Sequence, residues 1–373
     1  MTGLYIHIPF CAQFCTYCDF FSIRSRGLMG DLLRALKEEM VTRRDYITPP
    51  DTLYVGGGTP SLVPAKELGG LIEFAKELWK TDFVEVTVEL NPEDVTTDYG
   101  KELIDVGVNR ASVGIQSFCD NHLQFMNRRH SALQAIHAVE ALQSVGFQNI
   151  SLDLMFGFPG LLETEWRRNI QQALALHPKH ISAYQLGIEP GTPIYKEVNK
   201  GTIEMVEEDV AAGHYTLLQE MLATADFEQY EISNFAQKGY RSRHNSKYWL
   251  GVPYLGVGPA AHSYNGVARH ANVKSVQRYL DGINFGLPYI KKESITTKKR
   301  YNEFVMTRLR TAEGLCQKTF DEEFTDKKIR LYYEQSLHDL LQKGLLVMEA
   351  GYVKILPQKW FIVDGIIREL VVS

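Results

Sequence analysis

Long apolar segments are absent from this chain of 373 residues, and cysteine is scarce, with five in all. No apolar run approaches the roughly 18 residues that a membrane-spanning helix needs, so we expect no membrane span. Met1-Thr2-Gly3 leads directly into a short apolar stretch, without the basic and apolar regions of a secretory signal. We therefore expect a cytoplasmic location, where disulfide bonds are rare.

An excess of either charge is also lacking. Lysine and arginine number 40 against 45 aspartates and glutamates, which gives a formal net charge of −5. A nucleic-acid-binding protein favours a clustered basic face, so we do not expect nucleic acid to be the main partner. With 45% hydrophobic and 23% charged residues, the chain has an ordinary globular composition. Its length suits one large domain with one or two small ones.

Three of the five cysteines lie close together near the start of the chain, as Cys11, Cys15 and Cys18 in the spacing C-x-x-x-C-x-x-C. A structural zinc site usually needs four ligands, and no fourth ligand is evident nearby. Three thiolates can hold a [4Fe-4S] cluster and leave one iron open to a small molecule. We therefore predict such a cluster rather than zinc or a disulfide. Cys119 and Cys316 stand alone and are expected to be small buried residues.

Short apolar runs alternate with amphipathic stretches over residues 1–225. Strand–helix alternation predicts an α/β fold with a parallel sheet and right-handed crossovers. Six repeats fit an open, partial (β/α)6 barrel of the TIM type, in which ligands bind at the carboxyl ends of the strands. The runs that we predict to be strands are residues 4–8, 52–55, 84–89, 110–115, 150–155 and 180–185.

The alternation fades beyond residue 225. Residues 226–290 are rich in Gly, Pro, Tyr and His, and we expect ordered but irregular backbone there, packed against the barrel. Over 291–373, helices near 301–310 and 329–343 precede two strands around Ala350-Gly351, the pattern of a small winged-helix-like α+β module. Winged helices often bind DNA, but without a basic stripe we expect a packing or protein-contact role.

Glycines and polar residues follow or interrupt several predicted strands. Gly56-Gly57-Gly58-Thr59-Pro60 follows the second strand, but its spacing is not that of a nucleotide phosphate loop, and alone it is compatible with a simple turn. Glu89 ends the third strand, and its alternative to a site role is a helix-capping or solvated acid. Gln116 ends the fourth strand, and Arg128 follows it, with a surface salt bridge as the alternative for the arginine. Asp153 lies inside an apolar strand, where an acid is costly unless paired, so it is the better site candidate.

Residues 5–18, YIHIPFCAQFCTYC, resemble the radical S-adenosylmethionine (SAM) superfamily. In that superfamily the open iron binds the amino and carboxylate groups of SAM, and an electron from the cluster cleaves SAM to a 5′-deoxyadenosyl radical. The resemblance implies that the glycine motif meets the methionine amino group, that Glu89 meets the ribose, and that Arg128 pairs with the SAM carboxylate. The implied cofactor-binding residues are Tyr5, Tyr17, Gly57, Gly58, Thr59, Glu89, Gln116, Arg128 and Asp153.

The combination of this motif with GGGTP, GIQSF and the Asp153 strand followed by Gly-x-Pro is similar to the oxygen-independent coproporphyrinogen III oxidase family. Two features depart from the true oxidases. Phe20 stands where they carry a further cysteine, and residues 244–249 spell HNSKYW, an H-N-x-x-Y-W box. Both features resemble the haem-chaperone branch, the HemW type, whose members bind haem and are thought to deliver it to acceptor proteins.

The box also permits a direct chemical interpretation. His244 has the side chain of a common axial haem ligand, and Tyr248 and Trp249 can stack on a porphyrin. A loop histidine held by hydrogen bonds is the alternative for His244. His262, His270 and His7 are rival ligands, although we expect His7 to pack beneath the cluster.

Three functions therefore compete. The first is a haem chaperone, with haem, an acceptor protein and, by family resemblance, a low-potential electron donor such as flavodoxin or ferredoxin as partners. The second is oxidative decarboxylation of coproporphyrinogen III propionates by a 5′-deoxyadenosyl radical, against which Phe20 and the box both argue. The third is radical SAM chemistry that opens or alkylates a porphyrin.

Overall fold

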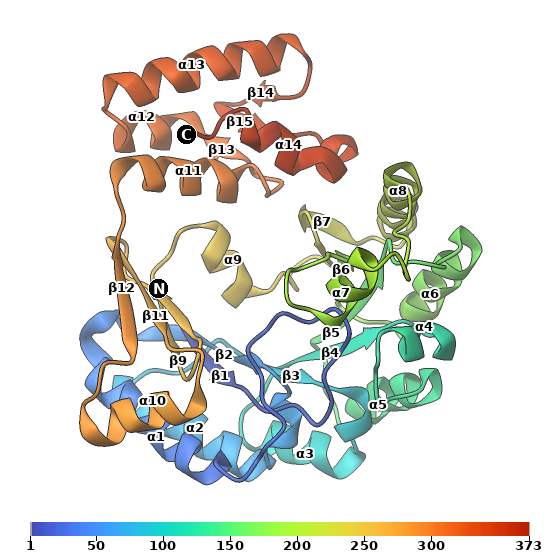
Figure 1. Cartoon of the computed structure of the whole chain (residues 1–373), viewed down its shortest axis with the longest axis vertical. Helices are drawn as coiled ribbons and strands as arrows, with labels where there is room; N and C mark the ends of the chain where they lie inside the picture. Colours follow the sequence, from blue (N-terminus) through green and yellow to red (C-terminus); the bar gives the residue numbers. More distant parts are fainter. Residues whose placement is uncertain (1, 373) are drawn as a thin grey trace.

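The computed structural model describes residues 2–372 and shows an α/β barrel beneath a small helical module (Figure 1). The first half alternates strands and helices as the sequence predicts. Its elements are β1 (Thr2–Ile8), α1 (Met29–Thr42), β2 (Pro50–Gly57), α2 (Ala65–Trp79), β3 (Glu85–Leu90), α3 (Thr97–Asp105), β4 (Arg110–Gln116), α4 (Asp120–Phe125), α5 (Ala132–Ser144), β5 (Ile150–Phe156), α6 (Glu163–Ala175) and β6 (His180–Gln185).

Strands β1 to β6 pair in parallel in chain order, and the sheet curves without closing. The period of two in a strand sends alternate side chains to opposite faces of the sheet. Leu4, Ile6 and Ile8 of β1 are fully buried on the face that the helices cover. On the inner face, polar side chains such as Glu89 of β3 and Asp153 of β5 line one cavity. The barrel thus has an apolar outer layer and a polar interior, which confirms the predicted fold class.

The segment expected to be irregular instead extends this sheet at both edges, which corrects the expectation for 226–290. The full order is β12-β11-β10-β9-β1-β2-β3-β4-β5-β6-β8-β7. These added strands have only three to five residues, too few for a clear alternating pattern. The elements are α7 (Pro193–Asn199), α8 (Glu208–Thr224), β7 (Glu228–Glu231), β8 (Asn234–Ala236), α9 (Arg243–Trp249), β9 (Tyr254–Val257), β10 (His262–Tyr264), β11 (Ala268–Asn272), α10 (Val276–Phe285) and β12 (Ile290–Ser294).

The short helix α9 packs against the starts of β1, β2 and β3. The Glu85 carboxylate, at the start of β3, accepts the backbone N–H groups of Arg243 and His244 at 2.9 and 2.8 Å. An acid at a helix N-terminus satisfies N–H groups that have no partner within the helix. A Cβ added to Gly3 of β1 would lie 3.0 Å from the His244 ring, so α9 sits tightly against the strand.

A separate three-stranded antiparallel sheet, in the order β13-β15-β14, marks the C-terminal module. It stacks above the barrel beside α9 (Figure 1, orange to red). The predicted hairpin and both predicted helices are present, and α12, β13 and α14 are additional. The elements are α11 (Thr297–Arg308), β13 (Leu315–Cys316), α12 (Gln317–Glu323), α13 (Lys327–Gln342), β14 (Val347–Glu349), β15 (Tyr352–Lys354) and α14 (Val363–Arg368).

Arg308 joins the module to α9. Its guanidinium donates to the carbonyl oxygens of Trp249 and Leu250 at 2.6 and 2.9 Å. A cation at a helix C-terminus satisfies carbonyls that have no partner within the helix. No helix among residues 2–372 is both long and apolar enough to cross a membrane.

Candidate functional site

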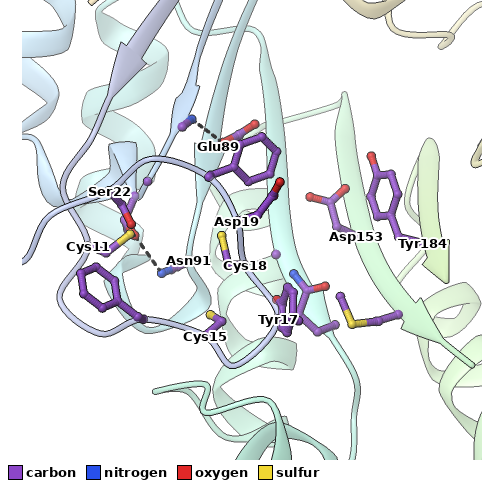
Figure 2. Close-up of a pocket in the computed structure, with 18 of the residues that line it drawn as sticks. Cys11, Cys15, Tyr17, Cys18, Asp19, Ser22, Glu89, Asn91, Asp153 and Tyr184 are labelled. Carbon is purple, nitrogen blue, oxygen red and sulfur yellow. Dashed lines mark hydrogen bonds between the residues drawn. The ribbon is translucent and has the colours of Figure 1, made fainter. Parts of the chain in front are cut away.

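A cavity of about 950 Å³ occupies the barrel interior and opens beside the cysteine loop (Figure 2). This volume lies at the upper end of the range for small-molecule sites. All three motif cysteines line it, together with residues from the carboxyl ends of the parallel strands. The cavity reaches as far as Asn245 on α9, so it extends from the cysteine motif to the H-N-x-x-Y-W box.

The loop after β1 brings the three cysteine side chains to the mouth of this cavity. Thr59 donates to the sulfur of Cys11 at 3.4 Å, and Arg128 donates to the sulfur of Cys15 at 3.5 Å. Burial, and to a lesser extent the neighbouring Cys15 and Cys11, raise the pKa of the Cys18 thiol to about 11. A bound cation offsets such a cost, because thiolates are the ligand form of cysteine.

The spacing of the three sulfurs also bears on the kind of metal. Tetrahedral zinc, with bonds of about 2.3 Å, draws its thiolates to within roughly 4 Å of each other. Among the described residues, Cys11, Cys15 and Cys18 do not form a set whose ligand atoms all lie within 4.8 Å of one another. The wider spacing suits a polynuclear cluster better than a single ion. The chain's donor set therefore fits an iron–sulfur cluster.

The glycine motif leaves room beside the cysteine loop that any side chain would fill. A Cβ on Gly58 would lie 2.7 Å from the Phe10 carbonyl oxygen and 3.0 Å from the Cys11 sulfur. Gly57 has φ of +117°, and its Cβ would meet the His7 ring at 2.6 Å. Only glycine fits at both positions. A side chain at either one would collide with its neighbours, and Gly57 also has a backbone conformation that other residues rarely adopt. His7 packs directly behind this turn.

Glu89 holds the turn in place from the end of β3. Its two oxygens accept hydrogen bonds from the Tyr54 hydroxyl at 2.8 Å and the Gly57 N–H at 3.0 Å. Burial raises the pKa of the Glu89 carboxyl to about 7, even though these two bonds and Arg110 act in the opposite direction. The carboxyl thus titrates near neutral pH.

Gln116 ends β4, and Arg128, in the segment after α4, reaches back to that strand. The Arg128 guanidinium donates to the Asn91 side chain at 3.0 Å and to the Gly114 carbonyl at 2.8 Å, as well as to Cys15. Gln116 has φ of +64°, next to an irregularity in the β4–β5 register. A non-glycine residue in that conformation is strained, and such strain is concentrated at functional sites. Both side chains line the cavity.

Asp153 and Tyr17 lie across the cavity from Glu89 and the glycine motif (Figure 2). Burial raises the pKa of Asp153 to about 6, although the hydrogen bonds of Ser182 and Ser112 and the charge of Arg110 lower it. Burial also raises the pKa of Tyr17 well above its ordinary value. Of the nine residues that the resemblance implies for SAM, eight line one cavity. Tyr5 is the exception, because its hydroxyl bonds to the His7 ring behind the wall.

The box residues His244, Tyr248 and Trp249 do not line the cavity. His244 is 1% exposed, and its ring nitrogens bond to the Thr52 hydroxyl and the Tyr248 hydroxyl, both at 2.9 Å. Burial, with the charges of Lys247 and Arg110, lowers the pKa of His244 to about 3, so the ring is neutral. For either nitrogen to bind iron, one of these hydrogen bonds must break.

Sequence reasoning missed several cavity residues and misjudged two cysteines. Most of the missed residues could have been found from the alternation along the strands, because each stands between or beside buried apolar residues and so faces the barrel interior. Cys119 and Cys316 are only partly buried, which corrects the expectation of fully buried cysteines, since both lie at helix starts near the surface. The missed cavity residues are Phe20, Tyr54, Asn91, Arg110, Ser112, Ser182, Tyr184 and Asn245.

Two protein-family models match this chain. Residues 5–173 match the Radical SAM superfamily, and residues 295–361 match the HemN C-terminal domain. The curated protein "Heme chaperone HemW" of Bacillus subtilis is 36% identical over 353 residues, which cover 93% of each chain. The chain belongs to the HemW family.

Other relatives support the HemW membership. The Lactococcus lactis protein of the same name is 33% identical over 344 residues, covering 92% of this chain and 90% of the relative. The solved structure of the coproporphyrinogen III oxidase HemN from Escherichia coli covers 99% of this chain with a TM-score of 0.82. At 19% identity, that likeness shows the fold that HemW and HemN proteins share.

Proposed function

We propose that this protein is a haem chaperone, which binds haem and transfers it to an acceptor protein. Its membership of a family whose curated members are called heme chaperones supports this proposal. The observation that carries it is the cavity, which extends from the three cysteines to Asn245 of the H-N-x-x-Y-W box. One space thus adjoins both the radical SAM residues and the feature that separates the chaperone branch from the oxidases.

Cys11, Cys15 and Cys18 would hold the [4Fe-4S] cluster of this proposal. When bound, such a cluster supplies single electrons and an open iron for the amino and carboxylate groups of SAM. Arg128 would pair with the SAM carboxylate, and the Gly57–Thr59 turn, kept in place by Glu89, would receive the methionine amino group. A low-potential donor such as a flavodoxin or ferredoxin would supply the electron.

The second candidate is the oxygen-independent coproporphyrinogen III dehydrogenase reaction. The observation that favours it is that Glu89, Arg128 and Asp153 share the cavity with the cysteines, as SAM chemistry requires. Phe20 argues against it, because the oxidases carry a cysteine there. In this structure Phe20 is 66% exposed at the mouth of the cavity.

The first test is an anaerobic titration of the cluster-reconstituted protein with haem, followed by Soret absorbance, with and without SAM. The chaperone proposal predicts saturable, stoichiometric binding, with the haem recovered intact. Incubation with coproporphyrinogen III, SAM and a reductant is the matched experiment. A vinyl-bearing product there, without stoichiometric haem binding, would replace the proposal by the second candidate.

His244→Ala tests whether the box imidazole binds haem. We expect weaker haem binding, by about tenfold or more, with the iron–sulfur absorbance retained, because His244 does not line the cavity that the three cysteines line. Tyr248→Phe is the matched control, since it removes only the hydroxyl that holds Nε2. Unchanged haem affinity and Soret position in His244→Ala would rule out this ligand and leave the ring with its structural role.

Cys15→Ser tests the cluster ligands. We expect loss of most of the iron and of the broad absorbance near 400 nm that iron–sulfur clusters show, because serine is a poor substitute for a thiolate ligand. Cys119→Ser, outside the motif, is the control and should retain both. A full cluster in Cys15→Ser would refute the assignment.

A further inference from the structure

Arg110 is the one fully buried arginine side chain on the cavity wall that the proposed SAM contacts leave unused. It opens β4, and its register partner across the sheet is Thr87 of β3. The next residue, Ala111, faces the helices, so the pleat directs Arg110 into the barrel. Arg110 is 1% exposed and lines the cavity, and its charge acts on His244 of α9.

The guanidinium of Arg110 has no partner among residues 2–372. Its Nε and Nη1 atoms are buried without a hydrogen bond, and no carboxylate oxygen lies within 4.0 Å of it. Burying an unpaired charge is among the most costly arrangements in a protein. Two other arginines of this half of the chain differ, because the buried Arg43 pairs with Glu39 at 3.0 Å and the half-buried Arg128 makes three hydrogen bonds.

The nearby acids are engaged elsewhere. Glu89 accepts from Tyr54 and Gly57, and Asp153 accepts from Ser112. Arg110 influences both acids through space only, by lowering their pKa values. Within the described part of the chain, the Nη2 atom of Arg110 also has no hydrogen bond and, unlike Nε and Nη1, keeps accessible surface, so its N–H groups are the ones open to a ligand. They can donate to a carboxylate oxygen in a charge-assisted hydrogen bond.

We infer that Arg110 anchors a carboxylate of the ligand held in this cavity and, resting on the proposed function, that this carboxylate is a propionate of haem. The propionates are the anionic groups of haem, so a buried cation recognises them and not the ring. Ser112 on the same strand as Arg110, Ser182 on β6 and Asn245 on α9 line the same cavity and supply further polar contacts. Arg128 remains for the SAM carboxylate, so each arginine serves a different ligand.

The test compares haem with its dimethyl ester, in which neither propionate is charged, on the cluster-reconstituted protein and on Arg110→Gln. We expect Arg110→Gln to weaken haem binding by about 10- to 100-fold, the range for hydrogen bonds to a charged group. The ester should bind the two proteins equally, and more weakly than haem binds the unaltered protein. Arg110→Lys, which keeps the charge but not the fork, should fall between them.

Several outcomes overturn the inference. Equal losses for haem and ester in Arg110→Gln, or no loss for either, would show that the arginine does not meet a propionate. A loss of SAM affinity with unchanged haem affinity would assign Arg110 to SAM instead. If the unaltered protein binds neither haem nor ester, the proposed function itself fails, and the inference fails with it.

A stability measurement guards against a folding artefact. Because Arg110 has no partner to lose, Arg110→Gln should leave the urea midpoint of the ligand-free protein unchanged or raised. Arg43→Gln is the matched control, and it should lower the midpoint, since it removes the cation that pairs with the buried Glu39 carboxylate. A fall in Arg110→Gln as large as that in Arg43→Gln would mean that Arg110 has a structural partner, contrary to the inference.

Discussion

Burial and hydrogen bonding act in opposite directions on the pKa of Glu89, a residue of the barrel interior. Its carboxyl accepts two hydrogen bonds that favour the charged form, yet burial is the larger effect and raises its pKa to about 7. An acid whose pKa is higher in the folded protein stabilises the fold below its ordinary pKa. That contribution is lost as pH rises from about 4.5 through about 7.

Glu89→Gln should therefore remove part of the pH dependence of stability. Glutamine keeps the shape but cannot ionise, so the variant should gain stability relative to the unaltered protein as pH rises from 5 to 8. One proton gives a slope of at most about 1.4 kcal/mol per pH unit. Urea unfolding at several pH values measures this difference. Glu140→Gln, at an exposed position of α5, should show no such trend, and a flat difference for Glu89→Gln would contradict the assigned titration.

Helix α9 is the element on which three parts of the chain converge. Glu85 of β3 meets its N-terminus, Thr52 of β2 meets His244, and Arg308 of α11 meets its last carbonyls. A helix of seven residues has little stability of its own, so these contacts hold it in the barrel. The C-terminal module thereby influences the end of the cavity that Asn245 lines.

Arg308→Ala should loosen α9 without unfolding the barrel. It removes two hydrogen bonds from a charged donor, a loss of about 1.5 to 3 kcal/mol each at most. Hydrogen exchange should speed up at the α9 amides and stay slow in β1 to β6. Arg310→Ala provides the comparison, because Arg310 pairs with the exposed Asp364 inside the module. Equal protection of α9 in both variants would show that Arg308 does not secure it.

Some of the strands and helices can be predicted from the sequence, and others cannot. β1 to β6 are predictable, because their apolar runs are long and separated by amphipathic helices. β7 to β12 are not, since they have only three to five residues and join the barrel sheet through the long-range pairs of β8 with β6 and of β9 with β1. The packing of α9 into the barrel is equally hidden, because the Glu85, Thr52 and Arg308 contacts come from three separate regions.

At the scale of the whole molecule, the candidate site is predictable where motif and strand end coincide. The cysteines, the glycine turn and Arg128 meet in one cavity, as the rule for parallel sheets requires. The rule about carboxyl ends does not predict Arg110, because this residue begins its strand. A lone arginine at such a position ordinarily pairs with an acid. Only the assembled interior shows that its neighbours Glu89 and Asp153 bond elsewhere.

The order of strands in the sheet also means that β1 must wait for a strand that is synthesised much later. β1 leaves the ribosome first, but one of its two neighbours is β9, and the register joins Gly3 to Tyr254. At about 5 to 20 residues per second, that edge and the barrel interior stay uncovered for roughly 12 to 50 seconds. A chain arrested in that interval exposes an unpaired, apolar strand edge, which invites aggregation. Nascent chains of this protein that end before residue 254 should therefore depend on cellular folding assistance, whereas completed chains should not.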